Sequence, residues 1–76
     1  MYTTKRPEPF YGWGQLAQSY GCGRLHLTVL SSAKGYYIGT CDEDGPVSRE
    51  SVEYYEMHST AKAALEEQSW TQRLDA

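Results

Sequence analysis

The strongest constraint on how this chain folds is a strict alternation of polar and apolar residues that leads into a second β-prone run. Residues 24–29 alternate in this way, which is the period of a strand with one buried face and one wet face. Residues 36–41 are rich in aromatic and β-branched side chains, and the small residues at 31–35 are typical of a hairpin loop. The sequence therefore predicts two antiparallel strands at 24–29 and 36–41.

A third strand is expected after an acidic turn. Residues 42–46 combine turn-forming aspartate and glycine with a proline that cannot donate to a strand ladder, which predicts a loop. Residues 47–56 follow the loop and are predicted as the third strand. In that strand, we expect Tyr55 to lie on the same open face of the sheet as Tyr37.

A helix is expected to cover the other face of the sheet. Ser59 is a favourable N-cap for a helix over residues 60–68. The residues expected on the buried face of this helix are Ala61, Ala64, Leu65 and Gln68. The small alanines would let the helix approach the sheet closely. The predicted fold class is therefore α+β, a three-stranded antiparallel sheet with one helix packed on one face, in the order βββα.

The first 23 residues differ in composition from the rest of the chain. Their proline and glycine content argues against a long regular element, so residues 1–23 are predicted to form an irregular arm and residues 24–76 the βββα domain. One short helical turn is expected at 15–20. Phe10, Tyr11 and Trp13 are too apolar for a free tail, so we expect part of the arm to fold back on the domain or to dock on a partner.

The charge and hydropathy of the chain limit the classes of partner and the cellular location that we expect. The formal net charge of -3 argues against the clustered positive charge that phosphate binding needs, which disfavours nucleic acid as a partner. No apolar stretch approaches the roughly 20 residues that span a bilayer, so no membrane contact and a cytoplasmic location are expected. In a reducing compartment, Cys22 and Cys41 are expected to be free thiols, with a disulfide between them as the alternative.

The sequence contains no complete catalytic or metal-binding motif. Cys22 and His26 have the spacing C-x3-H, and Cys41 and His58 could add two ligands, but the paired spacings of zinc sites are missing. There is no local nucleophile–base arrangement and no glycine-rich phosphate loop that follows a strand. We therefore predict no metal, no cofactor and no enzymatic activity.

Three segments carry a resemblance to known proteins. They are GYYIGT at 35–40, DGPVSRES at 44–51 and WTQR at 70–73. In these segments the chain resembles small uncharacterised proteobacterial proteins of plasmids, prophages and integrative elements. In size and charge, it is similar to anti-CRISPR proteins, and this resemblance implies a small inhibitor or adaptor that binds and blocks a host protein.

A second resemblance leads to a different function. The layout of YIGT at 37–40, a further strand and STAKAAL at 59–65 is similar to DNA-binding domains of the plant AP2 type and to integrase arm-binding domains. That resemblance implies a sheet that enters the major groove of DNA. A DNA-reading sheet presents several arginines and lysines, whereas Arg24 is the single fixed positive charge expected on the open face. Sheet-mediated DNA binding is therefore the alternative function.

The open face of the sheet is the predicted partner-binding surface. The candidate partner-binding residues are Tyr37, Tyr55, Arg24, His26, Tyr11 and Trp13. Tyr37 and Tyr55 would be amphipathic anchors of the kind found in interface hot spots. In the competing interpretation, the tyrosines only line a half-exposed sheet and pack against the arm. Because a short sheet has two open edges, a homodimer formed by strand pairing at an edge is a further expectation.

Overall fold

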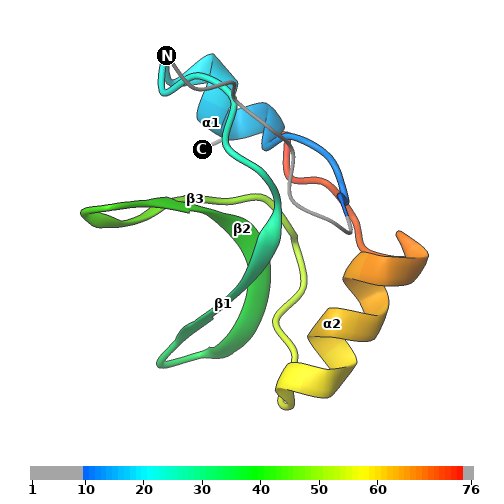
Figure 1. The fold of residues 1–76 in the computed structure, drawn as a ribbon. Coiled ribbons are helices and arrows are strands. Elements are labelled where there is room, and N and C mark those ends of the chain that lie inside the picture. The colour runs from blue at the N-terminus through cyan, green and yellow to red at the C-terminus, as the bar shows by residue number, and fades with distance from the viewer. Residues whose placement is uncertain (1–9, 75–76) are drawn as a thin grey trace.

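The computed structural model describes residues 10–74 of the chain, and its elements follow the predicted order (Figure 1). The elements are α1 (Gln15–Ser19), β1 (Thr28–Ser32), β2 (Gly35–Asp42), β3 (Gly45–Arg49) and α2 (His58–Glu67). The three strands form one antiparallel sheet in the order β1-β2-β3, and α2 contacts β1 and β2. The prediction of an α+β fold with a three-stranded antiparallel sheet and a helix on one face is confirmed.

The β1–β2 hairpin is longer and begins later than the alternation predicted. Leu30 pairs with Tyr37 and Ser32 pairs with Gly35, so only two residues form the turn and the predicted five-residue loop at 31–35 is wrong. Gly35 has a φ of 128°, which a side chain would strain. The strand starts at Thr28 rather than at residue 24 because the preceding residues pair with the arm instead of with β2.

The third strand differs most from its prediction. The structure places β3 at Gly45–Arg49, so Pro46 lies in a strand rather than in a loop, which an edge strand tolerates. After Arg49 the ladder is irregular, because the backbone N–H groups of Glu50 and Ser51 both donate to the carbonyl of Ile38 at 2.9 Å. The continuous strand predicted at 47–56 is therefore wrong.

This irregularity decides which way the later side chains point. Thr40 pairs with Ser48, whereas Tyr36 pairs with Tyr55, so four positions along β2 correspond to seven along the opposing chain. The three extra residues are an odd number, and an odd shift moves side chains to the other face of a sheet. Tyr55 therefore shares a face with Tyr36 and not with Tyr37, which overturns the expectation of a common face.

Helix α2 begins slightly earlier than predicted. The chain turns into the helix at Met57, whose carbonyl accepts the N–H groups of Thr60 and Ala61, so Ser59 lies inside the first turn and is not the N-cap. The prediction that Ala61, Ala64 and Leu65 are buried is confirmed. Gln68 is exposed and ends the helix in the left-handed conformation at a φ of 56°, so its predicted burial is wrong.

The hydrophobic core lies between α2 and the sheet. Its buried members are Leu27, Ile38, Ala64 and Leu65, and the partly buried side chains packed against them are Tyr11, Val29, Tyr55 and Trp70. Ala61 is fully buried, and small residues of this kind let the helix lie close to the strands. Within residues 10–74, no helix has the length and hydropathy needed to cross a membrane.

The described part of the arm folds back on the domain, which confirms one of the two expectations for the arm. Helix α1 at Gln15–Ser19 confirms the predicted helical turn, and it contacts β3. Leu16 and Ala17 of this short helix are buried. Residues 1–9 and 75–76, which belong to the predicted arm and domain, lie outside the described residues.

Candidate functional site

The outer edge of β1 carries backbone groups that are not paired within the described residues 10–74. In β2, Tyr36 and Ile38 direct their backbone groups toward the following chain, where they meet Tyr55, Glu50 and Ser51. Backbone direction alternates along a strand, so Val29 and Ser31, which stand opposite Ile38 and Tyr36, direct their N–H and C=O groups away from β2. Among residues 10–74, no backbone group pairs with that outer side of Val29 and Ser31.

The arm covers the chain just before this free edge. Gly14 donates its N–H to the carbonyl of Leu25 at 2.8 Å, and Leu27 donates its N–H to the carbonyl of Gly12 at 2.9 Å. Trp13 and His26 form the bridge between these two hydrogen bonds. Backbone pairing by the described arm therefore reaches Leu27 and leaves the edge of β1 open beyond it.

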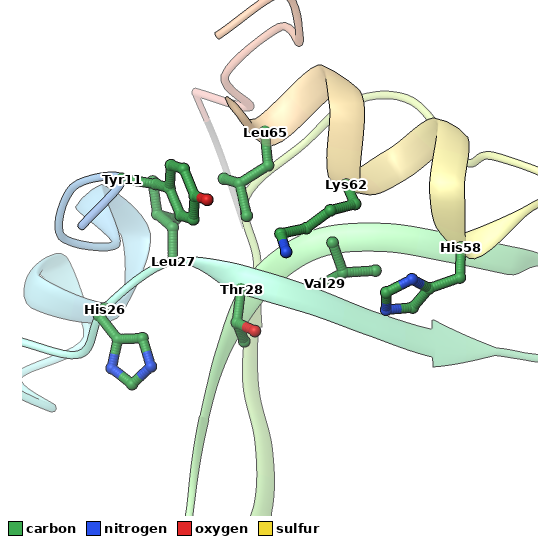
Figure 2. Close-up of a pocket in the computed structure, with 8 residues that line it drawn as sticks. All are labelled: Tyr11, His26, Leu27, Thr28, Val29, His58, Lys62 and Leu65. Carbon is green, nitrogen blue, oxygen red and sulfur yellow. The ribbon is translucent and has the colours of Figure 1, made fainter. Parts of the chain in front are cut away.

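A groove runs beside the open edge, between β1 and α2 (Figure 2). We call it the β1–α2 groove; its volume is about 210 Å³, and it is lined by Tyr11, His26, Leu27, Thr28, Val29, His58, Lys62 and Leu65. Its floor is apolar, because Leu27 and Leu65 belong to the buried core. Figure 2 shows the side chain of Lys62 extending from α2 toward β1, with the ring of His58 beside Val29.

The ionisable groups of the groove are basic or neutral. Lys62 and two histidines line it together with the phenol of Tyr11, and no carboxylate is among the lining residues. The nearest acid is the exposed Glu66, whose carboxylate lies 3.7 Å from the Lys62 ammonium and accepts the Tyr11 hydroxyl at 3.3 Å. Desolvation by the surrounding protein and the charge of Glu66 raise the pKa of Tyr11. The groove lining thus carries one fixed positive charge, on Lys62, and the Glu66 carboxylate lies just outside it.

The predicted partner-binding residues are only partly brought together. Tyr11 and His26 line the groove. Trp13 is the bridge partner of His26, and its ring packs on Phe10 with 4.8 Å between centroids. Arg24 is exposed and lies before this bridge. The structure therefore joins Tyr11, Trp13 and His26 at one edge of the sheet rather than on its open face, and Arg24 is outside the groove lining.

The two tyrosines proposed as anchors lie apart. Tyr55 is partly buried against the core beneath α2. Tyr37 is on the opposite face and is 7% exposed, with its ring 6.0 Å from that of Tyr54. Arg49 in turn stacks over Tyr54, with its guanidinium carbon 4.7 Å from the ring centroid. Burial raises the pKa of Tyr37, as expected of a phenol enclosed by its neighbours.

Two groove residues were not predicted from the sequence. Lys62 is outside the set of residues expected on the buried face of the helix, and His58 precedes the helix predicted at 60–68. A long lysine stem can lie along apolar surface while its ammonium stays in water, so helical spacing alone does not assign such a residue to one face. The ring of His58 packs edge-on against the ring of Tyr36, with 5.6 Å between the ring centroids. These two residues are far apart in the sequence.

A second cluster of interest surrounds the carboxylate of Glu50, which is fully buried. Its Oε1 accepts the N–H of Leu16 at 3.0 Å and the side-chain amide of Gln72 at 2.7 Å. Its Oε2 accepts the N–H of Ala17 at 3.0 Å and the hydroxyl of Ser48 at 2.6 Å. Each oxygen therefore has two donors, and the cluster is a closed hydrogen-bond network.

The Glu50 network is structural rather than reactive. Burial alone would raise the pKa of Glu50, but the hydrogen bonds from Leu16, Ser48, Gln72 and Ala17 outweigh it and the pKa is lowered. An enclosed carboxylate with a lowered pKa and no vacant lone pair is a poor general base. It instead ties the arm, the sheet and the C-terminal segment together.

The described part of the chain contains neither a cluster of metal ligands nor a disulfide. Among residues 10–74, no group of three or more histidines, cysteines or acids is arranged to hold a metal ion. Cys22 and Cys41 are both exposed free thiols, as expected from the sequence.

No family model, no curated protein and no solved structure matches this chain. The resemblance to proteins of mobile genetic elements therefore stays a prediction.

Proposed function

We propose that this chain is a small non-enzymatic protein-binding module, an inhibitor or adaptor that binds a host protein by adding an extended segment of it to β1. The observation that carries the proposal is the open backbone edge at Val29 and Ser31 beside the β1–α2 groove. An exposed edge strand is a template for another strand, and a neighbouring pocket for alternate side chains supplies specificity.

The groove supports a protein partner more than a nucleic acid. Val29 and Ser31 offer donors and acceptors in the spacing of a β-ladder, which matches a peptide backbone and has no counterpart in a phosphate chain. The opposite face, on which DNA binding would rely, carries Tyr37 and Tyr54 packed together with Arg49. Arg49 donates to the carbonyls of Ser51 and Val52, so it is already engaged within the chain.

The test uses a library of random linear peptides displayed on phage and selected on the purified protein. Enriched peptides are synthesised and their dissociation constants are measured by fluorescence anisotropy. Ser31→Pro removes one outward N–H of the edge without removing a bond to β2, so it should weaken binding about tenfold or more. Ser31→Thr retains the N–H and is the matched control.

Amide chemical shifts in the nuclear magnetic resonance spectrum locate the peptide. Perturbation centred on Val29 and Ser31, with weakened binding to Ser31→Pro and unchanged binding to Ser31→Thr, supports the proposal. Selection of no peptide above background, or of peptides that bind Ser31→Pro as tightly as the unmodified chain, contradicts it. A circular dichroism spectrum identical to that of the unmodified chain shows that Ser31→Pro is folded.

A further inference from the structure

Resting on the proposed function, we infer that the segment captured by the β1–α2 groove is acidic and places a glutamate or aspartate side chain opposite Val29. The inference concerns the chemistry of the partner, which neither the fold nor the edge pairing specifies. It follows from the charge of the groove and from the direction in which an added strand points its side chains.

The geometry of an added strand fixes which side chain enters the groove. Residues that stand opposite each other in neighbouring strands have side chains on the same face of the sheet. Val29 faces α2, because it packs against the core that α2 covers. A partner residue opposite Val29 would therefore point toward Lys62 and His58, which Figure 2 shows on the α2 side of Val29.

Charge complementarity selects an acid at that position. On the α2 side of Val29, the polar lining groups are the Lys62 ammonium and the His58 imidazole, and no lining residue carries negative charge. A carboxylate between the Lys62 ammonium and the His58 imidazole would gain charge-assisted hydrogen bonds, whereas a lysine there would be repelled. The net charge of -3 alone would favour a basic partner. The charge that we infer for the partner segment is therefore opposite in sign to that expectation.

Glu66 is the internal competitor of such a ligand. Its carboxylate lies 3.7 Å from the Lys62 ammonium, and both side chains are about half exposed. An exposed pair of this kind is weak, so an incoming carboxylate can replace it at small cost. Removing the negative charge with Glu66→Gln should leave Lys62 available and tighten binding of an acidic strand.

The experiment uses three labelled peptides of alternating threonine and valine that differ only at the central residue, which is glutamate, glutamine or lysine. Their dissociation constants are measured by fluorescence anisotropy at low salt. We expect the glutamate peptide to bind about fivefold more tightly than the glutamine peptide and the lysine peptide to bind most weakly. Glu66→Gln should widen the preference, and Lys62→Met should remove it.

Lys34→Met is the matched control, because it also removes one positive charge but lies in the β1–β2 turn, near Tyr54 and outside the groove lining. Binding that depends on Ser31 but shows equal affinity for the three peptides overturns this inference and leaves the proposed function standing. Loss of the glutamate preference in both lysine variants overturns it as well. Absence of Ser31-dependent binding by any peptide overturns the proposed function itself.

A short duplex DNA is the last probe. Displacement of the glutamate peptide by the duplex at the same salt would show that the groove recognises phosphate, and it would overturn the inference. We expect the peptide to remain bound.

Discussion

Glu50 accepts a hydrogen bond from the backbone N–H of Leu16 at 3.0 Å, across a separation of 34 residues. The contact joins the first helix to the segment that follows the last strand. A buried carboxylate requires compensation by hydrogen bonds, and here all the compensation comes from neutral donors. The Glu50 side chain therefore holds α1 against the sheet, in addition to the backbone hydrogen bonds that pair the arm with residues 25–27.

Replacing this carboxylate should destabilise the fold strongly. In Glu50→Gln, one oxygen becomes an amide nitrogen that faces existing donors, so hydrogen bonds are lost and buried donors are left without acceptors. We expect the free energy of unfolding to fall by about 3 kcal/mol in urea titrations at neutral pH. Glu56→Gln, at an exposed site, is the control and should change it by less than about 0.5 kcal/mol. Equal effects of the two substitutions would contradict the structural role of Glu50.

Acid should destabilise the protein through the same residue and through Glu53. Burial raises the pKa of each, but hydrogen bonds outweigh it, from the network donors for Glu50 and from Thr71 for Glu53, so both values lie below the ordinary 4.5. A folded-state pKa below the unfolded value contributes stability that is complete above the unfolded pKa and is lost as pH falls through the folded pKa.

The urea midpoint should therefore change little from neutral pH to about pH 5 and fall as the pH is lowered further to about 3. The slope should be shallower in Glu50→Gln, since one of the two linked protons is removed. A midpoint that rises on acidification, or an identical slope in the variant, would contradict this assignment.

Local patterns predicted the elements whose pairing is also local. The β1–β2 hairpin and α2 follow from alternation and helical spacing within single segments, so their existence was visible in the sequence. The third strand was also predicted, but its end at Arg49 was not, because the irregularity at Glu50 and Ser51 depends on which carbonyl both N–H groups meet. One odd shift there was enough to move Tyr55 to the other face.

The groove was predicted only in part for a related reason. His26 was predicted as an interface candidate from its place in the alternating segment 24–29, and Tyr11 from its place in the aromatic arm. Lys62 was not, since its role depends on the packing of α2 against an edge strand. Glu50 carried no distinguishing signal, because its four donors come from three separate parts of the chain.

Gly14 should not tolerate a side chain, for a purely steric reason. Its φ of -71° suits any residue, but an added Cβ would contact the Thr40 methyl group too closely and lie 2.8 Å from Oε2 of Glu50. We expect Gly14→Ala to lower the free energy of unfolding by about 2 kcal/mol through overpacking. Gly21→Ala has open space but a φ of 83°, so it measures backbone strain alone and should cost about 1 kcal/mol. A smaller loss for Gly14→Ala than for Gly21→Ala would contradict the close approach.

Tyr37 and Tyr54 should respond very differently to truncation, although their rings touch. Tyr37 is 7% exposed and Tyr54 is 37% exposed. Removing the enclosed ring in Tyr37→Ala leaves a cavity, so we expect a loss of about 3 to 4 kcal/mol of unfolding free energy, whereas Tyr54→Ala should lose about 1 kcal/mol. Urea titration of both variants, with far-ultraviolet circular dichroism to confirm folding, measures the difference. Similar losses would mean that Tyr37 is as accessible as Tyr54, and they would restore it as a candidate surface anchor.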